Sequence, residues 1–162
     1  MLVMNTYVHK LQRGSSLIEV MIAFFVLAVG MLGVLGMQST SIKMSKNAAL
    51  YSQANLLAAE GIEAVRSSPS AGATFNLAYG DTTPTAENCT TVGTECNVDD
   101  MANWSLAQWR AAVTSTLPGG ESQVVSVAAG NLRNVTVSIR FQIGYDDANG
   151  AITDEVQFNT VL

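Results

Sequence analysis

Apolar side chains follow three successive patterns along this sequence. Near the N-terminus they form an unbroken run, with no charged or strongly polar residue from Val20 to Met37 and no charge until Lys43. At a rise of about 1.5 Å per residue, a helix from about Leu17 to Ile42 would span a hydrocarbon core of roughly 30 Å. A domain of this size would struggle to cover such a helix on all sides, so the run predicts a membrane-spanning helix.

From Lys43 to Ser67 the pattern becomes one-sided. Apolar residues recur at three- and four-residue spacing, which predicts that the helix continues as an amphipathic rod. Pro69 is expected to end the rod, because proline disfavours helix in the residue before it and cannot continue the hydrogen-bond ladder. A continuous helix from about Leu17 to Arg66 would be roughly 75 Å long. The apolar stripe consists of Leu50, Ala54, Leu57, Ala58, Ile62 and Val65.

Glycines stand at every third position within the apolar run, at Gly30, Gly33 and Gly36. Each lowers helix propensity by roughly 1 kcal/mol relative to alanine. They predict either a locally weak helix or close packing against another helix through small residues. The sequence favours the two explanations about equally.

The third pattern is alternation in the C-terminal part of the chain. It predicts strands over 135–145 and 156–162, preceded by a short strand over 123–128. Residues 146–150 supply the turn of a hairpin. Their spacing does not fit a calcium-binding loop, because the distal glutamate is missing. We expect an antiparallel meander whose one face covers the helical stripe, which makes an α+β fold.

A short helix is predicted ahead of these strands. Asp99 and Asp100 precede a segment in which four large apolar residues share a helical face, and an Asp, Asn or Ser cap is expected near its start. Pro118 ends the helix. Two tryptophans on it indicate a core or a subunit contact more often than a sugar-stacking or membrane-interface site. The shared face comprises Leu106, Trp109, Val113 and Leu117, and the other tryptophan is Trp104.

Composition excludes several classes of function. Hydrophobic residues make up 48% of the 162 residues and charged residues 13%, with a net charge of −5. The absence of a basic run argues against nucleic acid as a partner. One histidine and two cysteines cannot assemble the usual four-ligand zinc site, so we expect no metal and no cofactor. No sequence pattern for nucleophilic or phosphate chemistry is present, so we expect no catalytic residues and no enzyme.

Charges beside the apolar run predict its orientation. Lys10 and Arg13 precede the run, and the first thirteen residues contain no acid, which places the N-terminus in the cytoplasm. No small-residue cleavage site follows the run, so we expect it to be retained. The remainder of the chain then lies in an oxidising compartment, where Cys89 and Cys96 are expected to form a disulfide. This disulfide would pin the Ser-, Thr- and Gly-rich connecting loop predicted over 68–98.

One acid lies just inside the apolar segment. Glu19 follows Leu17 and Ile18, and a carboxylate in a bilayer costs about 2.5 kcal/mol or more near the centre and less near the edge. Its position therefore indicates either a functional partner or simple solvation at the headgroup level.

Together, the segment Lys10 to Val20 and the apolar run that follows resemble the class III leader of type IV prepilins. Basic residues, a glycine at Gly14 and a glutamate five positions further on, at the head of a hydrophobic helix, make up the pattern. The chain is most similar to minor pilins of the PilV type, over about residues 10 to 66. The resemblance implies cleavage after Gly14 by the prepilin peptidase and N-methylation of Ser15. It also implies that Glu19 pairs with the N-terminal amine of a neighbouring subunit.

The resemblance further implies an organisation and a location. Residues 1–14 would be a cleaved leader, 15–42 a transmembrane and assembly helix, 43–67 an amphipathic helix and 68–162 a periplasmic head. The chain would reside in the bacterial inner membrane and then in the pilus fibre. Its partners would be the prepilin peptidase, other minor pilins, the major pilin and inner-membrane lipid. It would help to prime pilus assembly and support attachment and twitching motility.

Three other functions are compatible with parts of the sequence. A minor pseudopilin of a type II secretion system shares the leader, the helix and the α+β head. An adhesin module displayed on the pilus would use Trp104 and Trp109 or the 68–98 loop as its contact region. An ordinary single-span periplasmic protein would have Gly14 and Glu19 by coincidence.

Overall fold

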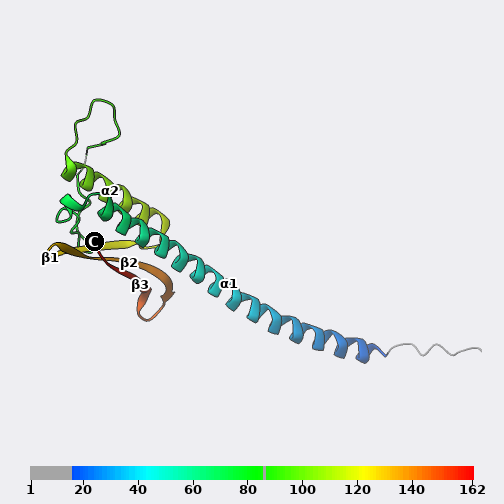
Figure 1. The fold of residues 1–162 in the computed structure, drawn as a ribbon. Helices are drawn as coiled ribbons and strands as arrows, with labels where there is room; N and C mark the ends of the chain where they lie inside the picture. Colours follow the sequence, from blue (N-terminus) through cyan, green and yellow to red (C-terminus); the bar gives the residue numbers. More distant parts are fainter. Residues whose placement is uncertain (1–15, 86) are drawn as a thin grey trace, which may run out of the picture. The chain divides into compact units, whose positions relative to one another are not determined.

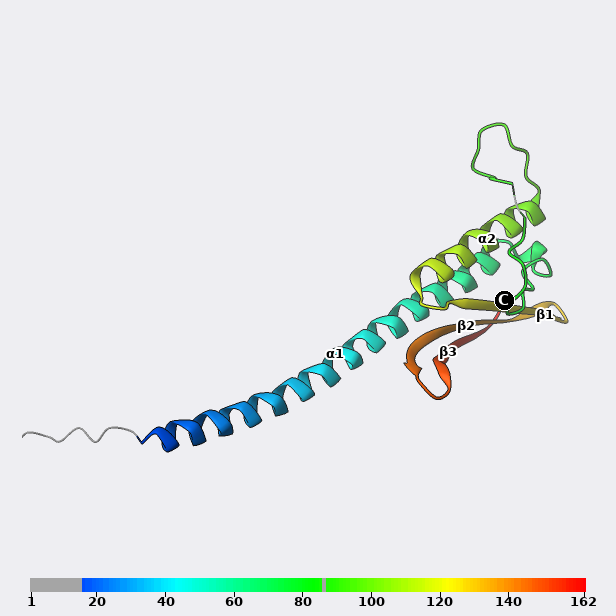
Figure 2. The same cartoon turned by 180° about the vertical axis from the view of Figure 1, so that it is seen from behind.

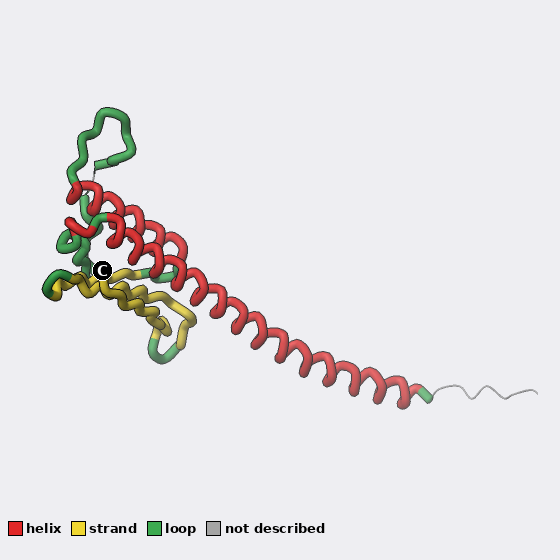
Figure 3. Tube along the Cα trace, viewed as in Figure 1, coloured by secondary structure: helices red, strands yellow, loops and turns green. Residues whose placement is uncertain are grey.

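The computed structural model describes residues 16–85 and 87–162. Its elements follow one another as α1 (Leu17–Ser67), a short 3₁₀ helix η1 (Pro69–Ala71), α2 (Val98–Thr116) and three strands, β1 (Glu121–Ala129), β2 (Leu132–Asp146) and β3 (Gly150–Val161) (Figures 1 and 3). Contacts divide the chain into two units, one up to Met44 and one from Ser45 to Leu162. A long N-terminal apolar helix followed by a small antiparallel sheet is an α+β, pilin-like architecture, as the sequence predicted.

Helix α1 runs without a break through all three glycines of the apolar run and ends at Ser67, two residues before Pro69, as expected. Up to Met44 its large apolar side chains are exposed. From Leu50 onward, five of the six residues of the predicted stripe are buried, and Leu57 packs partly buried against the same core. The apolar side chains of α1 are therefore exposed in its N-terminal part and buried in its C-terminal part, although the helix is continuous.

Helix α2 begins at Val98, earlier than the acidic pair suggested, because its cap precedes that pair. The side-chain oxygen of Asn97 accepts the backbone N–H of Asp100 at 2.9 Å, and the Asp100 carboxylate accepts the Asn97 N–H at 3.1 Å. This capping box satisfies two of the otherwise unpaired N–H groups at a helix start. The predicted apolar face of α2 is buried, and its members Leu106, Trp109, Val113 and Leu117 are all 3% exposed or less.

The three strands form one antiparallel sheet in the order β1-β2-β3. The predicted meander is confirmed, but all three strands are longer than predicted. β3 begins at Gly150 rather than at Val156, directly after the turn, where Gly150 adopts a φ of +83° that other residues avoid. A register shift between Gln142 and Gly144 locally disturbs the pairing of β2 with β3.

The core of the second unit lies between one face of the sheet and the end of α1. In both views α2 runs along one side of this part of α1 and the sheet along another (Figures 1 and 2). The Tyr51 ring meets Phe141 edge-on, with centroids 5.3 Å apart. Apolar side chains of β1 and β2 complete the layer: Val124, Val135, Val137, Ile139 and Phe141.

The connecting segment between α1 and α2 contains more structure than predicted. Phe75 and Leu77 are 1% and 5% exposed, and Leu77 forms an isolated bridge to Val124 of β1. The first part of the segment therefore contributes to the core, and the part that follows forms a loop. The predicted disulfide between Cys89 and Cys96 closes that loop.

Candidate functional site

The apolar part of α1 is the first candidate for function. Among the described residues, α1 is the one helix long and apolar enough to cross a membrane, judged by length and composition, and its most apolar stretch is wholly exposed. Exposed side chains of this kind, with all backbone bonds made inside the helix, suit a hydrocarbon environment. This segment fits membrane anchoring.

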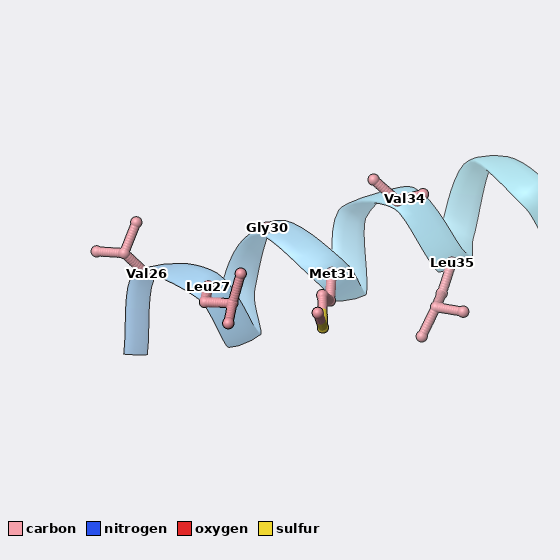
Figure 4. A pocket seen from close by; sticks show the side chains of 6 residues that line it. All are labelled: Val26, Leu27, Gly30, Met31, Val34 and Leu35. Carbon is pink, nitrogen blue, oxygen red and sulfur yellow. The ribbon is translucent and has the colours of Figure 1, made fainter. Parts of the chain in front are cut away.

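Small and large side chains alternate along this segment and leave shallow grooves. In Figure 4, Val26 and Val34 flank Gly30 on one row of the helix, and Leu27 lies on the neighbouring row. A methyl group added at Gly30 would meet nothing within 4 Å. A Cβ atom built at Gly33 or Gly36 likewise meets nothing within 4 Å among the described residues.

Glu19 lies exposed in the first turn of α1. The helix starts there with the backbone N–H of Glu19 donating to the carbonyl of Ser16 at 2.9 Å. A carboxylate in the first turn interacts favourably with the positive end of the helix dipole. The predicted cleavage and methylation site, Gly14 and Ser15, lies outside the described residues.

A charged and aromatic cluster occupies the sheet face turned away from α1. Arg140 of β2 lies between Glu121 of β1 and Glu155 of β3, with nitrogen-oxygen distances of 3.6 and 3.5 Å. Its guanidinium carbon is 4.2 Å from the centre of the Tyr79 ring. These contacts hold Tyr79, which comes from the connecting segment, against the sheet. No pattern in the sequence predicted this cluster, since its members are far apart along the chain.

Burial raises the pKa of Tyr79 to about 12, and the carboxylate of Glu155 adds to the rise. The Tyr79 hydroxyl is buried, and its contact with the Ser138 side chain opposes this rise. A tyrosine held in its neutral form is unsuited to act as a base near neutral pH. The cluster is therefore a structural device that ties the connecting segment to all three strands.

A second polar contact links α1 to β3. The Tyr51 hydroxyl donates a hydrogen bond to the Asp154 carboxylate. This bond lowers the pKa of Asp154 and raises that of Tyr51. The contact is maintained while Asp154 is ionised, so its contribution to stability is present above the ordinary carboxyl pKa and is lost as the pH falls.

The tryptophans differ in their surroundings. Trp109 is 3% exposed and donates its indole N–H to the Leu57 carbonyl at 2.7 Å. It belongs to the core and cannot serve as a stacking surface for a ligand. Trp104 is half-buried on the same helix.

The turn over 146–150 is a hairpin turn, as predicted. The Asp146 carboxylate accepts the N–H of Ala148 at 3.1 Å and a side-chain N–H of Asn149 at 2.7 Å. These bonds lower the pKa of Asp146. Within residues 16–85 and 87–162, no group of three or more His, Cys, Asp or Glu side chains is placed to hold a metal ion.

The comparisons with known proteins concern the N-terminus alone. The model of the prokaryotic N-terminal methylation motif matches residues 9–35. Comparison with curated proteins and with solved structures finds no match. The matched residues include the basic leader, Glu19 and much of the apolar run. The motif supports a type IV pilin or pseudopilin, a structural class of protein, and a class III leader implies processing by the prepilin peptidase.

Proposed function

We propose that this chain is a minor pilin that helps to initiate assembly of a type IV pilus and enters the fibre. The observation that carries the proposal is the methylation motif over 9–35, which continues directly into the exposed apolar part of α1. Cleavage after Gly14 leaves Ser15 as a methylated N-terminus. It also removes Lys10 and Arg13, which takes the net charge from −5 to −7.

Glu19 sets the axial position of the subunit in this proposal. Its carboxylate pairs with the N-terminal ammonium of a neighbouring subunit. Two opposite charges brought together in apolar surroundings offset each other's desolvation cost, whereas removal of one leaves an uncompensated charge. A subunit with this glutamate binds a neighbour that precedes it, and therefore need not be the terminal tip of the fibre.

Replacement of Glu19 by alanine tests this role. Because the apolar run is unchanged, we expect Glu19→Ala to remain in the membrane fraction at the wild-type level. We expect it to be lost from fibres sheared off the cells, since the paired charge is gone. Glu60→Ala, at an exposed position on the same helix, is the control and should enter fibres normally. Normal amounts of Glu19→Ala in sheared fibres would contradict the assembly role.

The motif is shared with minor pseudopilins of type II secretion systems, so a second experiment separates the two. Deletion of the gene from its native host should reduce the number of surface fibres, attachment and twitching. Export of secreted enzymes should continue. Loss of enzyme secretion with normal fibres would assign the chain to a secretion system instead.

A further inference from the structure

The two edges of the sheet differ in how their backbone groups are satisfied. Along β1, Leu77 and Val124 exchange two hydrogen bonds of 2.9 and 2.8 Å. The Asn76 side chain accepts the Ser126 N–H at 2.7 Å and donates to the Ser126 carbonyl at 3.2 Å. The connecting segment thus closes the middle of the β1 edge.

Within residues 16–85 and 87–162, no segment covers the β3 edge in this way. Arg133 and Leu162 exchange both backbone bonds at the start of the β2 and β3 pairing. Because antiparallel pairs alternate between bonded and non-bonded, every second residue of β3 turns its N–H and C=O away from β2. The residues that face outward are Glu155, Gln157, Asn159 and Val161. No strand among the described residues pairs with this edge.

Three of the four outward N–H groups are available to a new strand. The Glu155 N–H is taken by the neighbouring Asp154 carboxylate at 2.8 Å. Beyond it, Val156 to Leu162 contains no charge and no proline. Natural edge strands usually carry lysine, proline or a bulge that prevents pairing with other chains. From Val156 to Val161 the register of β3 is regular, and the segment contains none of these devices.

We propose that the β3 edge binds an edge strand from the head of a different pilin-type subunit and extends the sheet to a fourth strand. The proposal deepens the proposed function and rests on it. Backbone bonds from Gln157, Asn159 and Val161 supply the attachment. The exposed side chain of Val161 supplies apolar contact beside them.

A second copy of this chain is a poorer occupant for geometric reasons. Head-to-tail pairing of copies needs the β1 edge, which Asn76 and Leu77 close. Pairing of β3 with β3 relates two copies by a two-fold axis. A two-fold contact closes on itself, whereas a helical fibre is built from head-to-tail contacts. The partner must therefore bring an open edge of its own, and a different head can do so.

The experiment uses the full chain in its native host. A photoreactive phenylalanine analogue replaces Val161, and a control chain carries it at Val92, a fully exposed position in the disulfide loop. We expect a cross-link from position 161 alone, to a different protein that carries its own N-terminal methylation motif. A cross-link to a second copy of this chain, or none from position 161, would overturn the proposal.

A single proline substitution tests the backbone hydrogen bonds to the partner strand. Gln157→Pro removes an outward N–H and leaves the bonds to β2 in place, and proline is tolerated at such edge positions. We expect the cross-link yield to fall about tenfold relative to Gln157→Ala, which keeps the N–H. Equal yields would overturn the proposal.

A second variant and a processing control complete the design. If Gln157→Pro fails to fold, Asn159→Lys replaces it, since a lysine on an edge strand opposes pairing; an unchanged yield in that variant overturns the proposal. N-methylated Ser15 on the same chains shows that the prepilin processing on which the proposed function rests has taken place. A methylated chain without a cross-link therefore contradicts the strand pairing alone, whereas an unprocessed chain contradicts the proposed function.

Discussion

Gly61 shows how closely the elements of the head approach one another. It is buried on α1 opposite Trp109 of α2. A Cβ atom built there would lie 2.8 Å from Cζ2 of Trp109 and 3.1 Å from Cγ1 of Val137. The absence of a side chain therefore lets α1, α2 and the sheet meet at one point.

The sign of the change in the free energy of unfolding of Gly61→Ala should reveal this close approach. In an exposed helix the change from glycine to alanine stabilises by about 1 kcal/mol. Here the indole ring and Val137 must shift, so we expect the free energy of unfolding to fall by about 1 to 3 kcal/mol. Denaturant unfolding of the full chain in detergent, followed by tryptophan fluorescence, measures it. Ser52→Ala, at an exposed position of α1, is the control. An increase in stability for Gly61→Ala would contradict the packing described.

Residue-level contacts of this kind were largely hidden in the sequence. Periodicity placed Trp109 on a helical face with three other apolar side chains, but it left open whether that face packs in the core or against another subunit. It did not identify Gly61, since a glycine in a helical pattern indicates weakness as readily as close packing. Nor did it pair Arg140 with Tyr79, because that contact depends on the fold of the connecting segment.

At the scale of elements, the start of α2 depends on a short stretch of chain. Cys96, in the disulfide, is followed at once by Asn97, the cap of α2. The loop that the disulfide closes thus ends where the helix begins. A defined helix start is useful here, because α2 supplies Trp109 and Leu106 to the core.

Asn97→Ala should weaken the head through this cap. The variant removes the acceptor for the Asp100 N–H and breaks the capping box, which costs about 1 kcal/mol. Asn103→Ala, inside the same helix, should not lower stability, since alanine is the better helix former. Thermal unfolding of both variants in detergent measures the difference. Equal melting temperatures for Asn97→Ala and the wild type would show that the cap contributes nothing.

The sequence predicted the type and order of the elements better than their limits. The helix α1 was predictable almost to the residue, since an apolar run, a helical stripe and Pro69 define it independently. The start of β3 was not, because residues 150–155 mix small, polar and acidic side chains without clear alternation. Pairing with the longer β2 strand extends β3 over them. Which edge of the sheet is covered depends on contacts between segments far apart in the sequence, so no local pattern predicted it.

At the scale of the whole chain, the two units differ in how much of their function the sequence indicates. The part up to Met44 contains the whole methylation motif and the apolar segment, and both are recognisable in the sequence. The methylation motif ends at residue 35, before the head from Ser45 onward, so evidence for the function of the head comes from its surfaces. The proposed roles divide accordingly. Glu19 sets the position of the subunit, and the β3 edge selects a partner.

Processing of the N-terminus is the central claim, since assembly through Glu19 presupposes it. The most direct test is the intact mass and N-terminal sequence of the chain purified from its native membranes. We predict a chain that begins at Ser15, with its amine methylated and the leader absent. A chain that still begins at Met1, in cells with an active prepilin peptidase, would contradict the account and leave an ordinary anchored protein.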